Sequence, residues 1–126
     1  MRILADSNIF VDFWRNPPQE MIDRFRRDQI VICGVVRSEL LHGAVSEKNL
    51  GKIRETLELF DSFEMSKNDW YTLGEQLYML RTHGLTVPLA DAIIACLAMK
   101  NDVPVWTHDN HFRKMQEILK ELKVID

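Results

Sequence analysis

The chain has 126 residues, of which 46% are hydrophobic and 28% are charged, and its formal net charge is −3. This composition excludes an intrinsically disordered chain and predicts one domain, residues 1–126, with a core of ordinary size. The longest uninterrupted apolar run, residues 92–99, is too short to span a bilayer, and no basic segment followed by an apolar core opens the chain. We therefore expect a cytoplasmic protein.

The N-terminal segment predicts a strand that leads directly into a helix. Residues 2–5 are a short apolar run, and Asp6, Ser7 and Asn8 follow with three residue types that favour helix N-termini. Proline suits the first helical turn, so the two prolines at 17–18 predict a second helix that runs through residue 25.

The next segment predicts a second strand followed by two helices. Residues 29–33 are β-branched and apolar, and Gly34 closes this strand. Residues 35–44 have a helical pattern, and the helix after them has apolar side chains at three- and four-residue spacing. These side chains are Leu50, Ile53, Leu57 and Phe60. We expect the two helices to pair as a hairpin.

Residues 63–65 predict a short third strand, and a capping box follows it. Ser66 and Asp69 have the spacing of that motif, which opens a helix, and Gly84 is expected to end it. The apolar side chains of this helix are expected to face inward. They are Trp70, Leu73, Leu77 and Leu80.

The C-terminal part contains the most apolar helix. Pro88 begins it, it runs to about Lys100, and residues 103–107 predict the strand that follows. A last helix is expected to bury four apolar side chains, Phe112, Met115, Leu119 and Leu122. Strands that alternate with helices predict an α/β fold: a three-layer sandwich with a mostly parallel central sheet flanked by helices on both faces.

Four acidic residues fall where such a fold would bring them together. Asp6 and Asp109 come just after two predicted strands, at the end of a parallel sheet where ligands bind. Asp91 and Glu39 lie on apolar helical faces and are expected to point inward. Carboxylates in apolar surroundings are costly unless neutralised, and divalent cations do this where several converge. The pattern therefore predicts a metal site formed by Asp6, Glu39, Asp91 and Asp109.

Each acid also has a simpler explanation. Asp6 and Asp109 could cap the helices that follow them, Asp91 could complement its helix dipole, and Glu39 could reach solvent. Taken singly, these roles account for the first three acids well. Glu39 lies in mid-helix, where neither a cap nor a dipole favours an acid. The joint position of all four on one side of the predicted sheet favours the metal site.

The residues beside these acids suit a hydrated metal ion. Ser7, Asn8 and Thr107 are candidate supporting polar residues, although turn and strand roles explain them equally well. His108 and His111 lack the helical spacing of a zinc pair and are expected to be surface or packing residues rather than ligands. An all-oxygen ligand set favours one or two Mg²⁺ or Mn²⁺ ions over Zn²⁺.

The net charge permits a nucleic-acid partner. Without the four candidate acids the chain has 15 acidic and 16 basic residues, and two divalent cations would cancel the charge of the site itself. Basic groups occur at Arg15, at residues 24–27 and at 113–114, although solvated helix faces carry such groups routinely.

Three segments in a fixed order resemble a known family. They are LADSNIFVDFW, VVRSELLHGA and GLTVPLADAIIACLAMKNDVPVWTHDNHF. In the most specific stretch, residues 88–112, an acid opens an Ile/Ala-rich helix, and a strand and a Thr-x-Asp-x-x-Phe ending follow. These segments resemble the PIN-domain ribonucleases, specifically the toxin half of VapBC-type toxin–antitoxin pairs, over nearly the whole chain.

The resemblance implies a PIN-like fold and a Mg²⁺- or Mn²⁺-dependent endoribonuclease that leaves 5′-phosphate and 3′-hydroxyl ends on RNA. It implies Asp6, Glu39, Asp91 and Asp109 as the acidic site, with the three polar residues named above in support. It also implies a homodimer and inhibition by a cognate VapB-like antitoxin. Many relatives carry a second aspartate two residues after the fourth acid, and here that position is His111.

Two other classes fit parts of the pattern. A phosphorylatable receiver domain has a similar length and an acidic pocket at the same sheet edge, but it needs an aspartate at the end of a central strand, and residues 63–65 offer none. A noncatalytic PIN-fold RNA-binding or protein-interaction module would keep the fold without the chemistry. Only the presence of all four acids argues against this alternative.

Overall fold

A computed structural model describes all residues, 1–126, and contains seven helices and five strands. In chain order these elements are β1 (Arg2–Ala5), α1 (Ser7–Arg15), α2 (Gln19–Arg27), β2 (Gln29–Cys33), α3 (Gly34–His42), α4 (Glu47–Leu57), β3 (Asp61–Phe63), α5 (Lys67–Thr82), α6 (Leu89–Lys100), β4 (Val105–Trp106), α7 (Asn110–Ile118) and β5 (Val124–Ile125). None of the helices combines the length and apolar character that crossing a membrane requires.

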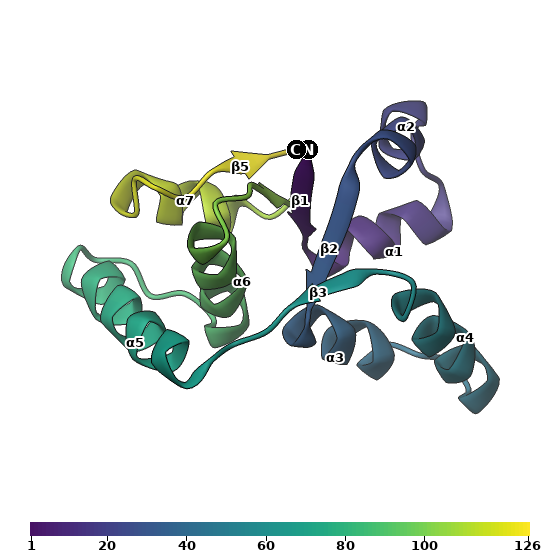
Figure 1. The fold of residues 1–126 in the computed structure, drawn as a ribbon, viewed down its shortest axis with the longest axis horizontal. Coiled ribbons are helices and arrows are strands. Elements are labelled where there is room, and N and C mark those ends of the chain that lie inside the picture. Colours follow the sequence, from purple (N-terminus) through teal and green to yellow (C-terminus); the bar gives the residue numbers. More distant parts are fainter.

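The five strands form one parallel sheet in the order β3-β2-β1-β4-β5, with β1 at its centre (Figure 1). The chain moves outward from β1 to β2 and β3, then returns to the other side of β1 for β4 and β5. Because parallel crossovers are right-handed, this reversal puts helices on both faces. Figure 1 shows α1 to α4 on one side of the sheet and α5 to α7 on the other. The predicted three-layer sandwich is confirmed, with a wholly parallel sheet.

A single cluster of 33 buried residues forms the core. In β1, Ile3, Leu4 and Ala5 have no exposed surface, as expected of a parallel strand that is covered on both faces. Helix α6 is also enclosed: every residue from Ala92 to Ala98 is buried, since the helix contacts α5, α7 and β4. The burial of this helix on all sides fixes the position of its first turn.

The sheet edges differ from the sequence prediction. Strand β3 ends at Phe63 instead of beginning there, because Val31 and Cys33 of β2 pair with Asp61 and Phe63. Asp61 is polar because β3 is an edge strand, and the Gln29 amide donates a hydrogen bond to its carboxylate. The predicted strand 103–107 is reduced to two residues. The equally short β5 was not predicted, because two residues are too few to show the alternation of apolar and polar side chains that indicates a strand.

Three helical predictions also need correction. Trp70 is 51% exposed and does not face inward, because Asp69 fills the buried position of that turn and binds Lys100 at 2.6 Å. Leu119 and Leu122 are buried as predicted but lie beyond the end of α7. Phe60 lies beyond α4, where its ring contacts Phe10 at a centroid distance of 5.2 Å.

Candidate active site

The candidate acids lie near the point where the strand order reverses. From β1 the chain adds β2 and β3 on one side of the sheet and later adds β4 and β5 on the other side. In such sheets a crevice forms beyond the carboxyl ends of the two strands where the order reverses. Asp6 directly follows β1, and Asp109 comes three residues after the end of β4. Glu39 is in α3, which begins where β2 ends, and Asp91 is in the first turn of α6. Helices α3 and α6 are in contact, so the four acids come from segments that meet at this edge.

Asp6 is buried, with 4% of its surface exposed, and its carboxylate is held on both sides. The Ser7 N–H donates to Oδ1 at 2.8 Å, and the Thr107 hydroxyl donates to Oδ2 at 2.8 Å. Burial raises the pKa of Asp6, the charges of Asp91 and Asp109 raise it further, and the two hydrogen bonds act against this rise. Asp6 does cap α1, as the simpler explanation predicted, yet two other carboxylates also act on it.

The Thr107 hydroxyl joins the ends of β1 and β4. It donates to Asp6 and accepts the Asp109 backbone N–H at 3.0 Å and the Asn8 side-chain amide at 3.4 Å. Thr107 is 1% exposed, so these partners replace water completely. One hydroxyl therefore fixes the first and fourth candidate acids relative to each other.

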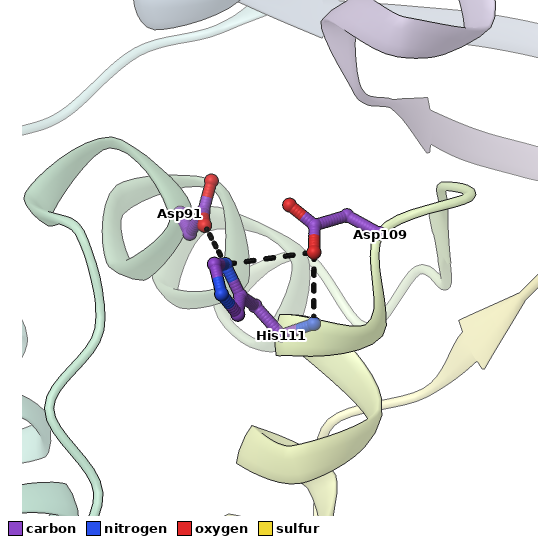
Figure 2. Close-up of side chains that lie close together, drawn as sticks. All are labelled: Asp91, Asp109 and His111. Atoms are coloured by element: carbon purple, nitrogen blue, oxygen red, sulfur yellow. Dashed lines mark hydrogen bonds and ion pairs between the residues drawn. The ribbon is translucent and has the colours of Figure 1, made fainter.

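Asp91, Asp109 and His111 form the tightest group of potential metal ligands in the structure. One donor atom from each residue lies within 4.8 Å of the other two. Figure 2 shows the His111 ring between the two carboxylates, with Asp91 on α6 and the other two residues at the start of α7. The Asp91 side chain is 14% exposed. Burial raises the pKa of Asp91, the charge of Asp109 raises it further, and the hydrogen bond from His111 opposes the rise.

Glu39 is exposed, contrary to the expectation that it faces inward. It lies in α3 between Val36 and Leu40, whose side chains occupy the buried face of the helix. The surrounding atoms still remove enough water to raise its pKa, and the charges of Asp6 and Asp91 add to this effect. A hydrogen bond from the Ser7 side chain acts in the opposite direction. Glu39 therefore belongs electrostatically to the acidic site, although it is outside the tightest group.

None of the four acids forms an ion pair with a lysine or an arginine. Three of them have raised pKa values, and like charges contribute to each rise. A set of repelling carboxylates without a lysine or arginine partner fits a divalent cation. The residues that could hold one are Asp6, Glu39, Asp91 and Asp109, with His111 beside the last two.

The two histidines of the Thr-His-Asp-Asn-His run behave differently. His108 Nδ1 lies 2.7 Å from Asp12 Oδ2 on α1, so this ring is a surface residue as predicted. His111 is exposed as predicted, and it also lies close to Asp91 and Asp109. Helical spacing gave no indication of these two neighbours, which come from the first turn of α6 and from the cap of α7.

Comparisons with known proteins agree with this architecture. The family model described as PIN domain matches residues 3–118. The chain belongs to the PIN domain family. This PIN domain is 24% identical over 126 residues to Ribonuclease VapC1 of Methanocaldococcus jannaschii, covering 99% of this chain and 88% of that protein.

Solved structures show the same fold. DNA-bound VapBC from Salmonella typhimurium matches this PIN domain with a TM-score of 0.84 and 22% identity, covering 100% of this chain and 98% of that chain. VapBC-1 from nontypeable Haemophilus influenzae matches with a TM-score of 0.83, 22% identity and the same coverage. At these identities the likeness shows the fold, and the chemistry of this chain rests on its own residues.

The Thr107 hydroxyl should stabilise this PIN domain. Thr107→Val removes one of the two donors to Asp6 and leaves the Asp109 N–H without its acceptor, so it should lower the free energy of unfolding by about 1–3 kcal/mol. Thr107→Ser keeps the hydroxyl and should stay closer to the wild type. Urea denaturation measures both, with Thr72→Val on the exposed side of α5 as the matched control. A Thr107→Val protein as stable as the control variant would contradict this role.

Glu39 should make the metal-free protein less stable as pH rises. Below its ordinary pKa of 4.5, the carboxyl is protonated in both folded and unfolded states, and Glu39→Gln should have little effect. Above 4.5 the unfolded chain ionises first, so the wild type should lose stability relative to the variant until pH passes the raised pKa. Glu39 is exposed, so solvent screening should keep the difference below about 1 kcal/mol.

Urea denaturation in EDTA at several pH values measures this difference. Glu75→Gln, at an exposed glutamate of α5 outside the site, is the matched control for replacing one carboxylate with an amide. A wild-type-to-variant difference that stays constant with pH would contradict the repulsion described for Glu39.

Proposed function

We propose that this chain is a metal-dependent endoribonuclease and the toxin half of a VapBC-type toxin–antitoxin pair. The observation that carries the proposal is the group of four mutually repelling carboxylates at the strand-order reversal, none of them paired with a lysine or an arginine. The PIN family match and the similarity to Ribonuclease VapC1 support the ribonuclease class.

The donor set suits one or two Mg²⁺ or Mn²⁺ ions, because carboxylate oxygens are hard ligands. In this proposal Asp6, Glu39, Asp91 and Asp109 hold the metal. A bound divalent cation supplies Lewis-acid chemistry, which lowers the pKa of a water molecule and neutralises charge that develops on the phosphate during RNA hydrolysis.

The residues of the chain itself orient this site. The Thr107 hydroxyl and the Ser7 backbone N–H each donate a hydrogen bond to one oxygen of Asp6. The backbone N–H of His111 donates to Oδ1 of Asp109 at 2.9 Å. In this proposal Ser7, Asn8 and Thr107 are positioning residues, because the Ser7 hydroxyl lowers the pKa of Glu39 and the Asn8 side-chain amide donates to the Thr107 hydroxyl. A site whose acids are fixed in advance loses little free energy to rearrangement when substrate binds.

The RNA strand needs a path to these acids, and a groove beside Glu39 offers one. The groove has a volume of about 570 Å³ and lies among α1, α3 and α4. Arg15, Lys52 and Asn49 line it together with Glu39. Two cations and an amide are groups that bind phosphate and sugar oxygens without reading sequence. The groove therefore supports contact with an RNA backbone.

The nuclease proposal predicts that Asp91→Asn abolishes metal-dependent RNA cleavage. Loss of a metal ligand should lower the rate at least about 100-fold, since even partners outside the ligand shell typically cost 10- to 100-fold. The measurement is cleavage of total RNA by purified protein with Mn²⁺ or Mg²⁺ and with EDTA. Asp102→Asn is the matched control, because this aspartate is exposed and its positive φ of 52° suits asparagine.

Equal cleavage by the wild type and Asp91→Asn would point to a contaminating nuclease. Such a result, or no cleavage with metal present and any partner removed, would contradict the enzyme. Those results would favour the noncatalytic PIN-fold RNA-binding or protein-interaction module.

We propose that a VapB-like antitoxin inhibits the enzyme from the same groove. Trp14 is 41% exposed at this groove, and Val11 beside it is 37% exposed, so an apolar segment can pack there. An arginine of that segment would reach the unpaired carboxylates near Glu39 and form a bidentate pair. The groove is thus both the route to the acids and the surface that an inhibitor would block.

Trp14→Ala should weaken inhibition by the antitoxin. An exposed tryptophan in the centre of an interface commonly contributes 2 kcal/mol or more, so the concentration for half-inhibition should rise by about 30-fold. The measurement titrates the cognate VapB-like antitoxin of this proposal into the cleavage assay, with each variant compared with its own uninhibited rate. Leu59→Ala, at an 83% exposed leucine outside the groove, is the control. Equal inhibition of Trp14→Ala and the control would contradict this docking surface.

We further propose that residues 1–126 act as one nuclease domain, as a homodimer in the cytoplasm. Trp70, Tyr71 and Tyr78 of α5 are exposed at 51%, 67% and 62%, and aromatic residues are enriched at protein interfaces. A monomeric mass by light scattering at micromolar concentration would contradict the dimer.

A further inference from the structure

His111 faces two carboxylates at once. Its Nδ1 lies 3.1 Å from Asp91 Oδ2 and 3.5 Å from Asp109 Oδ1 (Figure 2). His108 offers a comparison within the same run of residues, because its ring contacts a single carboxylate, Asp12. The His111 ring forms a hydrogen bond with Asp91 and has Asp109 nearby as a second carboxylate. A ring nitrogen close to two candidate metal ligands is in position to be a third donor to the same ion.

The three donors stand on rigid elements. His111 is the second residue of α7, its backbone N–H is bonded to Asp109, and the next residue, Phe112, has no exposed surface. Asp91 lies in the first turn of α6, and the seven residues after it are all buried. The backbone positions of the donors are therefore fixed before an ion binds, which lowers the cost of assembling the site.

The separations fit the edges of a coordination shell. Adjacent ligands of an octahedral ion with metal–ligand distances of about 2.1 Å lie about 3 Å apart. The His111–Asp91 separation equals this value closely, and the His111–Asp109 separation is slightly longer. Asp109 Oδ1, the oxygen nearer to the His111 ring, accepts the cap bond of α7 and keeps a second acceptor position. This oxygen and the ring nitrogen can therefore face one ion together.

We propose that His111 is a ligand of the metal ion and gives the site a nitrogen donor that favours Mn²⁺ over Mg²⁺. This inference rests on the metal-dependent function proposed above and identifies the metal preference of that site. Imidazole suits transition metals better than Mg²⁺, which binds oxygen ligands and water. As a ligand, His111 offers the lone pair of Nδ1 and keeps its ring proton on Nε2.

The decisive experiment is electron spin echo envelope modulation on the Mn²⁺-loaded, full-length protein, in a nitrogen-free buffer and without a histidine tag. A directly bound imidazole produces ¹⁴N modulation of the Mn²⁺ signal. We expect this modulation in the wild type and in His108→Ala, and we expect its loss in His111→Asp with Mn²⁺ still bound. Calorimetry should show a lower Mn²⁺-over-Mg²⁺ preference in His111→Asp and at least about tenfold weaker Mn²⁺ binding in His111→Ala.

The outcomes separate this inference from the function on which it rests. Bound Mn²⁺ without ¹⁴N modulation in the wild type would overturn the role of His111 and leave the carboxylate site standing. Modulation that persists in His111→Asp would also overturn it. No Mn²⁺ binding at all would overturn both the metal-dependent function and this inference. The wild-type spectrum is decisive by itself, so the test does not depend on the folding of a variant.

Discussion

Electrostatic repulsion among carboxylates is the constraint that the rest of this structure must satisfy. Asp6, Glu39 and Asp91 all have raised pKa values, and each feels the charge of at least one other acid of the site. Such a group tends to separate unless the scaffold holds it together. The free energy that offsets this repulsion comes mainly from the burial of the 33 core residues, which include those of the enclosed helix α6.

The sheet topology determines which residues can meet. Because β1 and β4 are neighbours but lie 100 residues apart in sequence, the Thr107 hydroxyl reaches Asp6 across 101 positions. The Asp6 backbone N–H also donates to the carbonyl of Trp106 at 2.9 Å. Backbone and side-chain bonds thus tie the two strand ends at the same place. Stability and site geometry depend here on the same few contacts, which is why a single buried hydroxyl affects both.

Local sequence signals predicted the elements that local interactions determine. Residues 2–5 and 29–33 are strands with the predicted limits, and Ser66 and Asp69 form the predicted capping box, because apolar runs and caps act over a few residues. Trp70 was mispredicted because a distant residue, Lys100, binds Asp69 and decides which side of that turn is buried. Strand β5 depends on a partner strand and was invisible in the sequence for the same reason.

The candidate site follows the same division. The strand ends of Asp6 and Asp109 and the apolar face of Asp91 could be predicted from the sequence. The exposure of Glu39 depends on which face of α3 packs against the rest of the protein, and Val36 and Leu40 form that face. His111 is a surface residue as predicted, but its two carboxylate neighbours could not be foreseen, because they come from another helix and from the cap of its own helix. The spacing of residues within one helix cannot predict contacts with carboxylates that lie outside that helix.

Capping and metal binding are compatible roles for one aspartate, although the sequence presents them as alternatives. An ionised carboxylate has two oxygens and about four acceptor positions, and a helix cap uses one of them. Asp109 caps α7 through Oδ1 and leaves Oδ2 without a protein donor. Asp6 has one donor on each oxygen and retains acceptor capacity on both. The cap fixes the rotamer of the carboxylate, and a fixed rotamer is what a preorganised metal site requires. The simpler structural role therefore explains how each acid is held, and the proposed metal site explains why several repelling acids lie together.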